Sequence, residues 1–245
     1  MIKIHELSEE RQQGLIVTYK FEEYGIANPF FIPSGKILDA QLTERQMQSC
    51  MPKEYVYKSG NDFDWNCYKE NVEIQKKIAN AFVYNFVDFQ REGRGIYIYS
   101  NTKGSGKTML SCCIANEILK KIDISVKFIS VPDYIELVKD KSEASKNQIY
   151  SIMNAGLLIV DDVGAQVENK DWITTALFRL IDSRYTGIRP TIFTSNVRME
   201  ELNTDSRISD RIYAMSVPLM MPEVNIRRKI ADKHTSAFLD KVLNN

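Results

Sequence analysis

Apolar and polar positions alternate in two different ways along most of the chain. Short apolar runs, such as IYIYS at 96–100, are separated by longer stretches in which apolar residues recur every three or four positions. The first pattern is typical of strands buried on both faces of a sheet, and the second is typical of helices. Regular alternation of the two predicts an α/β fold, with a parallel sheet covered by helices on both faces.

The predicted strands lie at 96–100, 126–130, 157–162, 191–196 and 215–219. The predicted helices lie at 107–121, 132–140, 172–185, 205–214 and 224–243, after an earlier helix with Ile74, Ile78, Phe82 and Phe86 on one face. Because these four residues follow an i, i+4 spacing, we expect them to pack in the core.

Residues 1–48 have a different pattern and are predicted to form a small N-terminal arm, separate from a main domain at 49–245. Polar helical stretches are expected around 6–15 and 39–48, split by a Pro- and Gly-containing loop at 24–36. The arm is interpreted either as a partner-binding element or as a packing extension without a partner.

Composition narrows the possible functions. The 32 Lys and Arg residues balance the 32 Asp and Glu residues, so nucleic-acid contact would require a local basic patch. The charged start predicts no secretory signal, and no apolar run is long enough to span a membrane. None of the four cysteines forms a C-x-x-C pair, and only two histidines are available as ligands, so neither a zinc site nor disulfides are expected. A cytoplasmic protein with reduced thiols is therefore expected.

A phosphate-binding loop is predicted between the strand at 96–100 and the helix at 107–121. The pattern G-x-x-x-x-G-K-[ST] aligns with Asn101, Thr102, Lys103, Gly104, Ser105, Gly106, Lys107 and Thr108. Backbone N–H groups and the helix N-terminus favour phosphates, Lys107 supplies charge, and the Thr108 hydroxyl suits Mg²⁺. Asn101 replaces the first glycine, and asparagine tolerates a positive φ, so we expect the loop still to bind ATP.

Two carboxylates end the predicted strand at 157–162. Parallel sheets collect functional groups at the carboxyl ends of their strands, where the phosphate loop also lies. Asp161 is predicted to reach Mg²⁺, and Asp162 to polarise the attacking water. Asn196, the last residue of the predicted strand at 191–196, is a candidate for orienting that water or for contacting the γ-phosphate.

Arginines follow in two places. Arg207 and Arg211 lie one helical turn apart and could be presented to the γ-phosphate of a neighbouring subunit. Arg227 and Arg228 come later in the chain. A solvated basic face is the alternative interpretation for both pairs.

These motifs, in this order, resemble the AAA+ ATPases, and LLIVDDVGAQ to TSNVRMEEL in particular resembles the replicative helicase loaders of the DnaC/DnaI type. The resemblance covers about residues 50–240. It implies a compact core without a large helical lid. The phosphate-binding loop would be Walker A, and Asp161 and Asp162 would be Walker B. Sensor 1 would fall at Asn196, the arginine finger at Arg211, and sensor 2 at Arg227 or Arg228. Some loaders carry an N-terminal zinc domain, which is not expected here because no cysteine precedes Cys50.

The resemblance also implies partners: a replicative DNA helicase, single-stranded DNA, and self-association or partner contact through Arg207 and Arg211. The DNA-contacting segment of the family falls at 130–150, where stacking and charge would come from Tyr134, Lys139, Lys141, Lys146 and Tyr150. Acidic residues among these lysines weaken the local field.

Three other functions stay open. An IstB-type transposition helper has nearly the same motifs but would bind duplex DNA and a transposase. A nucleotide-bound interaction module with little hydrolysis is compatible with Asn101 and with the short side chain of Asp162. A small-molecule kinase is disfavoured by the paired arginines after TSN and by the lack of an acceptor-binding insertion.

Overall fold

The computed structural model describes residues 2–6, 14–20, 27–33, 35–164 and 171–243. Its backbone divides into two compact units, residues 1–47 and 48–245, each with its own sheet.

The first unit contains a small antiparallel sheet in the order β1-β2-β3. Its elements are β1 (Ile2–Glu6), β2 (Gly14–Lys20) and β3 (Ala27–Pro33), followed by helix α1 (Gly35–Gln48). In the register, Ile4 lies opposite Val17, and Val17 lies opposite Phe30.

The prediction for this arm is wrong in two places. A helix is predicted around 6–15, but residue 6 ends β1 and residues 14 and 15 begin β2. The rest of that prediction, residues 7–13, lies outside the described part of the chain. Residues 27–33, expected in a loop, form β3. The alternation of apolar and polar residues in IKIHE and the β-branched residues of LIVTYK favour strands, and this signal outweighs the polar composition around it. The helix predicted at 39–48 is present within α1.

The second unit is built on a five-stranded sheet in which every neighbouring pair is parallel. Its strands are β4 (Gly95–Tyr99), β5 (Val126–Ser130), β6 (Leu157–Val163), β7 (Thr191–Ser195) and β8 (Ser216–Met220), in the order β5-β6-β7-β4-β8. The predicted parallel sheet is thereby confirmed. The order places β7 between β4 and β6, and because the three strands are parallel, their carboxyl ends share one edge of the sheet.

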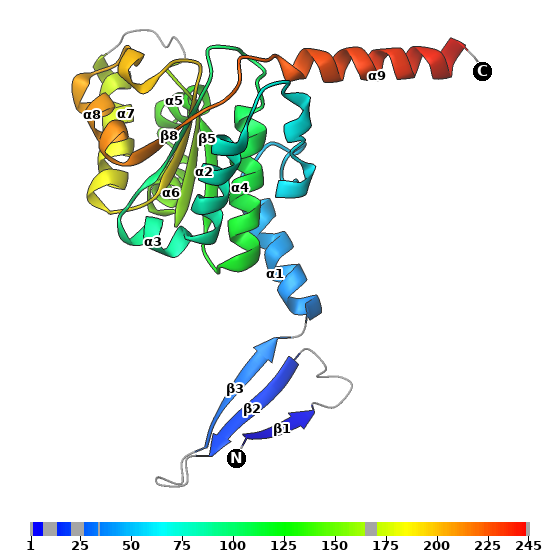
Figure 1. The fold of residues 1–245 in the computed structure, drawn as a ribbon. Helices are drawn as coiled ribbons and strands as arrows, with labels where there is room; N and C mark the ends of the chain where they lie inside the picture. Colours follow the sequence, from blue (N-terminus) through cyan, green and yellow to red (C-terminus); the bar gives the residue numbers. More distant parts are fainter. Residues whose placement is uncertain (1, 7–13, 21–26, 34, 165–170, 244–245) are drawn as a thin grey trace. The chain divides into compact units, whose positions relative to one another are not determined.

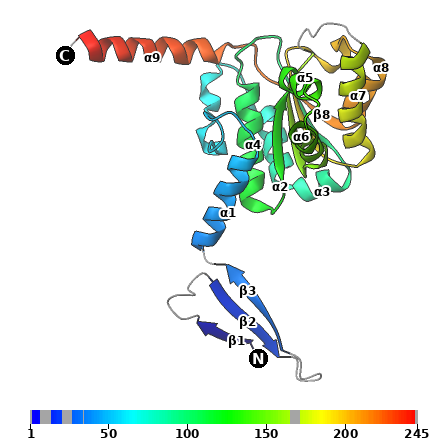
Figure 2. The same cartoon turned by 180° about the vertical axis from the view of Figure 1, so that it is seen from behind.

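Helices cover both faces of this sheet, as Figures 1 and 2 show from opposite sides. On one face α4 (Lys107–Lys121) packs on β4, β6 and β7, and α2 (Glu73–Tyr84) packs on α4 and β8. On the other face α5 (Val131–Lys139) and α6 (Glu143–Asn154) pack on β5, and α7 (Asp171–Thr186) packs against α5, α6 and α8 (Ser206–Ala214). The other helical elements in the described part of the chain are η2 (Gly60–Asp62), η3 (Trp65–Cys67), α3 (Phe86–Arg91), η4 (Met199–Glu201) and α9 (Ile226–Leu243).

The core follows the predicted strands closely, with one correction at the helix before β4. Phe82 and Phe86 are almost completely buried, whereas Ile74 is 71% exposed. The buried face of α2 runs through Ala79, Phe82 and Val83, and Ile74 lies in the first turn, outside that face. Within the described residues, no helix combines the length and the apolar character needed to cross a membrane.

Candidate nucleotide-binding site

The loop between β4 and α4 needs glycine at two positions. Gly104 and Gly106 have φ angles of +74° and +92°, which L side chains rarely adopt. A Cβ at Gly104 would also lie 2.7 Å from the Asn225 side-chain oxygen, and one at Gly106 would lie 3.0 Å from the Tyr68 hydroxyl. These two glycines therefore cannot be replaced without strain, which is the property expected of a loop that brings its backbone close to phosphate.

Asn101 stands in the place of the first glycine without the positive φ that we expected there. Among the described residues, those other than glycine that have positive φ are Cys50, Asp162 and Ile188, and Asn101 is not one of them. Its N–H donates to the Glu223 carboxylate at 2.8 Å. The backbone at this position is therefore ordinary, and the prediction that asparagine serves there through a positive φ is wrong.

Lys107, the first residue of α4, lies buried beneath the loop. Its Nζ donates to the Ser100 and Thr102 carbonyl oxygens at 3.2 and 3.1 Å and to the Ser105 hydroxyl at 3.3 Å. Burial lowers the pKa of this ammonium below its usual range, and nearby carboxylates, Asp162 first, offset part of that effect. A buried cation whose hydrogen bonds go to neutral oxygens is poised to receive an anion.

Asp161 and the Thr108 hydroxyl meet at the carboxyl edge of the sheet. The hydroxyl donates to Oδ1 and Oδ2 of Asp161 at 2.9 and 3.2 Å, and the Thr194 hydroxyl of β7 donates to Oδ1 at 2.5 Å. Burial raises the pKa of Asp161 above its ordinary value, although both hydroxyls oppose that shift. The two groups predicted to hold Mg²⁺ are thus adjacent, although they come from residues far apart in the sequence.

Asp162 has an unusual backbone. Its φ is +58°, and the pairing of β6 with β7 is irregular between Val160 and Val163. The Asp162 N–H donates to the same Thr194 hydroxyl at 3.0 Å, so one side chain fixes both acidic residues. An aspartate with positive φ stores strain, and such residues cluster at functional sites. Because of this irregularity, Asp162 does not follow the regular alternation of side chains between the two faces of the sheet.

The donors present fit a magnesium ion that arrives with nucleotide. Mg²⁺ usually takes one or two carboxylates and completes its shell with phosphate oxygens and water. Thr108 and Asp161 supply oxygen donors of this kind. Across the described residues, no group of three or more His, Cys, Asp or Glu side chains forms a metal site that would be complete without nucleotide.

The Thr194 hydroxyl holds both Asp161 and Asp162 in place. We therefore expect Thr194→Val to lower Mg²⁺-dependent ATP hydrolysis by about 10- to 100-fold, the range seen when groups that support metal ligands are removed. Valine keeps the shape of threonine but cannot donate to Asp161 or accept from Asp162. Steady-state kinetics should show the loss mainly in kcat. Thr194→Ser, which keeps the hydroxyl, should restore most of the rate; equal losses in both variants would contradict this role.

Asn196, Arg227 and Arg228, the candidate sensor residues, differ in their contacts with the phosphate loop. Asn196 follows β7 directly and is half-buried. The Arg227 N–H donates to the Gly104 carbonyl oxygen at 3.1 Å, whereas the Arg228 N–H donates to the Asn225 side chain at 3.0 Å. The charge of Arg227 also helps to lower the pKa of Lys107. Of the two arginines, Arg227 is therefore the one whose charge acts on Lys107 of the phosphate loop.

Arg207 and Arg211 lie on α8, where both guanidinium groups lie over the Phe178 ring. Arg211 donates through Nε to Asp182 of α7 at 2.8 Å, and its side chain is 26% exposed. Arg207 pairs with Asp205 and is 63% exposed. To reach the phosphate of another subunit, Arg211 would have to break its ion pair with Asp182, whose side chain is 33% exposed.

One predicted DNA contact is wrong. Tyr134 is only 1% exposed, and its hydroxyl donates to the Ala176 carbonyl oxygen at 3.3 Å, so it belongs to the core. The helical period of α5 places it on the buried face. Tyr150 is 71% exposed and Lys141 is also exposed, whereas Lys139 and Lys146 pair with Glu136 and Glu143.

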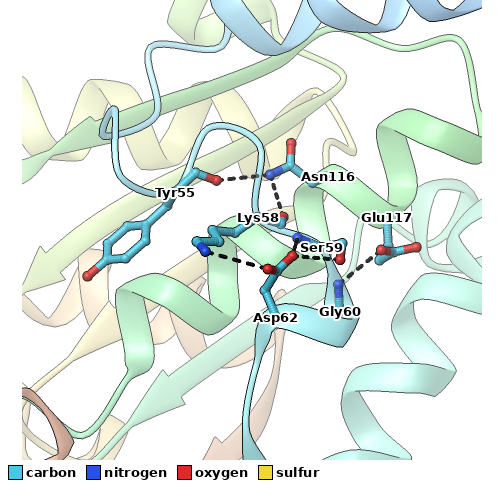
Figure 3. Close-up of polar contacts among 7 residues, drawn as sticks. All are labelled: Tyr55, Lys58, Ser59, Gly60, Asp62, Asn116 and Glu117. Carbon is cyan, nitrogen blue, oxygen red and sulfur yellow. Dashed lines mark hydrogen bonds and ion pairs between the residues drawn. The ribbon is translucent and has the colours of Figure 1, made fainter. Parts of the chain in front are cut away.

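The segment that precedes the core makes contacts that the sequence did not reveal. Asn116 of α4 donates to the carbonyl oxygens of Tyr55 and Lys58 at 3.1 and 2.8 Å, and Glu117 accepts from the Gly60 N–H at 3.0 Å (Figure 3). Tyr68, further along the same segment, donates to the Ser105 carbonyl oxygen of the phosphate loop at 2.6 Å. These contacts join residues that lie 37 to 61 positions apart in the sequence, so no local pattern indicates them.

Comparisons with known proteins agree with this geometry. The chain is 29% identical over 188 residues to the replicative helicase loader DnaC of Escherichia coli K12, covering 73% of this chain and 76% of that protein. It is 22% identical to the replicative helicase loader DnaI of Bacillus subtilis 168, covering 91% and 82%. A crystal structure of DnaI superposes with a TM-score of 0.61 and 26% identity, over 74% of this chain and 98% of that one. The model of the family described as IstB-like ATP binding protein matches residues 37–216, more than half of the chain. The protein therefore belongs to the IstB-like ATP-binding family and has the AAA+ core of the helicase loaders.

Proposed function

We propose that the protein is a DNA-replication helicase loader that is switched by the binding and hydrolysis of ATP. The proposed binding of ATP rests on one observation: a buried lysine, a hydroxyl and a carboxylate come together at the carboxyl edge of the sheet. Lys107 is 6% exposed, and Asp161, 7% exposed, accepts from Thr108 at 2.9 Å. The loader part rests on the two replicative helicase loaders to which most of the chain is similar.

The residues of the chain divide the chemistry between them. Lys107 and the backbone N–H groups of the loop bind the phosphates, while Thr108 and Asp161 would hold Mg²⁺. That ion neutralises phosphate oxygens when it is bound. Asp162 accepts a proton from the attacking water, and Asn196 orients that water. Both Asp162 and Asn196 are half-buried, so water can reach them.

A loader needs different affinities in its ATP and ADP states more than it needs fast turnover. We therefore expect slow hydrolysis that partners stimulate. The partners proposed are a replicative DNA helicase and single-stranded DNA, the latter contacted through the exposed side chains Lys141 and Tyr150. Base stacking on an exposed tyrosine is compatible with binding that does not read sequence.

A transposition helper is the second candidate, because the family model that matches the chain is the IstB-like one. Such a protein would respond to duplex DNA. The two functions therefore differ in the form of DNA that stimulates hydrolysis, and this difference can be measured.

Mg²⁺-dependent ATP hydrolysis should rise when single-stranded DNA is added, and rise less with an equal mass of duplex. Arg211→Ala should lower the stimulated rate by at least about 10-fold and leave ATP affinity within about twofold, because an arginine finger acts on the transition state. Arg179→Ala, at an exposed position of α7, is the matched control. Stimulation by duplex alone would favour the transposition helper, and ATP binding without hydrolysis would favour an interaction module.

Whether Arg211 acts on a neighbouring copy can be decided by mixing variants. A protein with Lys107→Ala keeps Arg211 but has a defective loop, whereas Arg211→Ala keeps the loop. If the arginine acts between copies, an equimolar mixture should hydrolyse ATP faster than either variant alone. No gain on mixing would exclude this role for Arg211 between copies.

A further inference from the structure

The phosphate loop is held on its outer side by groups that do not belong to the loop motif. Tyr68 donates its hydroxyl to the Ser105 carbonyl oxygen at 2.6 Å. At the start of α9, the Ile226 and Arg227 N–H groups donate to the Gly104 carbonyl oxygen at 2.8 and 3.1 Å. Two consecutive peptide units of the loop are therefore fixed through their carbonyl oxygens.

This has a direct consequence for the N–H groups. A peptide unit is planar and trans, so its C=O and N–H bonds point in opposite directions. Binding of the Ser105 carbonyl by Tyr68 turns the Gly106 N–H away from Tyr68, and binding of the Gly104 carbonyl turns the Ser105 N–H away from α9. Successive N–H groups that face one side form a concave anion-binding surface.

Without such a hold, the peptide between Ser105 and Gly106 would rotate easily. Glycine accepts positive and negative φ, so a peptide that adjoins it has more than one stable orientation. The φ of Gly106 is +92°. A hydrogen bond from outside the loop selects one of these orientations before any phosphate arrives, which is preorganisation.

Tyr68 is itself rigidly placed. It is 4% exposed, and its ring stacks on that of Phe63 with centroids 6.3 Å apart. The Asp64 side chain accepts from the Asn66 N–H at 2.9 Å and begins the turn that leads to Tyr68. Further back, Ser59 donates to Asp62, and Asn116 and Glu117 of α4 hold the chain at Tyr55, Lys58 and Gly60 (Figure 3).

We propose that Tyr68 is a positioning residue that orients the phosphate-binding N–H groups of the loop through the Ser105 carbonyl. The proposal rests on the proposed binding of ATP at this loop. Tyr68 acts on the phosphates and not on the base, because its hydroxyl hydrogen bond goes to the backbone of the loop.

The test is Tyr68→Phe, which keeps the ring and removes only the hydroxyl. Tyr134→Phe is the matched control, since Tyr134 is equally buried and its hydroxyl also donates to a backbone carbonyl, that of Ala176, away from the loop. Binding of Mg·ATP and of tripolyphosphate, which has no base or ribose, is measured by competition with a fluorescent ATP analogue. Tyr68→Phe should weaken both ligands by about 3- to 10-fold, the factor for one lost hydrogen bond, and Tyr134→Phe should weaken neither.

The outcomes separate this proposal from the proposed function. Unchanged affinity of Tyr68→Phe for tripolyphosphate, or a loss confined to Mg·ATP, overturns the role of Tyr68 while ATP binding by the wild type stands. If the wild type binds neither ligand, the proposed function fails. The carbonyl-carbon NMR shift of Ser105 then still tests the contact without nucleotide: it should differ between the wild type and Tyr68→Phe, and an unchanged shift overturns the proposal.

Discussion

Lys107→Ala should weaken the binding of Mg·ATP by at least about 100-fold and abolish detectable hydrolysis. Removing one member of a buried charge pair costs about 2–5 kcal/mol, and the triphosphate would lose its only buried lysine partner among the residues that the structure describes. The loss should appear as a rise in Kd in calorimetry. It should also appear as the disappearance of thermal stabilisation by nucleotide, which at 100 times Kd is about 2.7 kcal/mol.

The same substitution should leave the protein without nucleotide nearly as stable as the wild type, because two effects offset each other. Removing Lys107 leaves two carbonyls and one hydroxyl without its N–H donors, but it also relieves a desolvated charge whose pKa is lowered mainly by burial. Lys121→Ala, at the exposed end of the same helix, is the control and should keep its thermal shift with ATP. A normal thermal shift in Lys107→Ala would exclude nucleotide binding at this loop.

Arg184→Ala should lower the free energy of unfolding by about 3–5 kcal/mol. Arg184 is completely buried and donates to the Ala155 carbonyl, to the Thr191 hydroxyl at 3.1 Å and to the Pro190 carbonyl at 2.6 Å. Burial lowers its pKa to about 9, so it remains a cation at neutral pH. Each carbonyl left without a donor costs about 1–3 kcal/mol, and the empty volume adds to that cost.

Urea unfolding measures this effect, with Arg179→Ala, exposed on the same helix, as the control. Arg184 binds groups at the amino ends of β6 and β7, the sheet edge opposite the phosphate loop. At low temperature, folded Arg184→Ala should therefore bind Mg·ATP with an affinity within about twofold of the wild type. A loss of stability below about 1 kcal/mol would show that water or rearranged groups satisfy these carbonyls.

Much of the main domain could be predicted because the relevant signals are local. The strand before the phosphate loop, the loop and α4 follow one another without interruption, so their order alone places Lys107 and Thr108 at a helix N-terminus. The meeting of Thr108 with Asp161 followed from the rule that the carboxyl ends of parallel strands share an edge. The small N-terminal sheet was missed because polar residues around its strands concealed a short period-2 pattern.

Other features depend on which residues meet in space. Tyr68 and Ser105 lie 37 residues apart, and Asn101 and Glu223 lie 122 apart, so no local pattern connects either pair. Tyr134 carries an aromatic ring among lysines, which suits DNA contact on composition, but the packing of α5 on the sheet buries it. Composition cannot say which face of a helix is covered.

The sequence by itself determined the alternation of strands and helices, the phosphate loop and the acidic strand end, because periodicity and motif spacing are properties of contiguous residues. Only the tertiary structure decided how these parts are held. It placed Thr194 between two aspartates, Asp182 beside Arg211, and Tyr68 and the start of α9 against the loop. Such contacts arise when distant segments pack, and their geometry follows from the whole fold rather than from any one stretch of the chain.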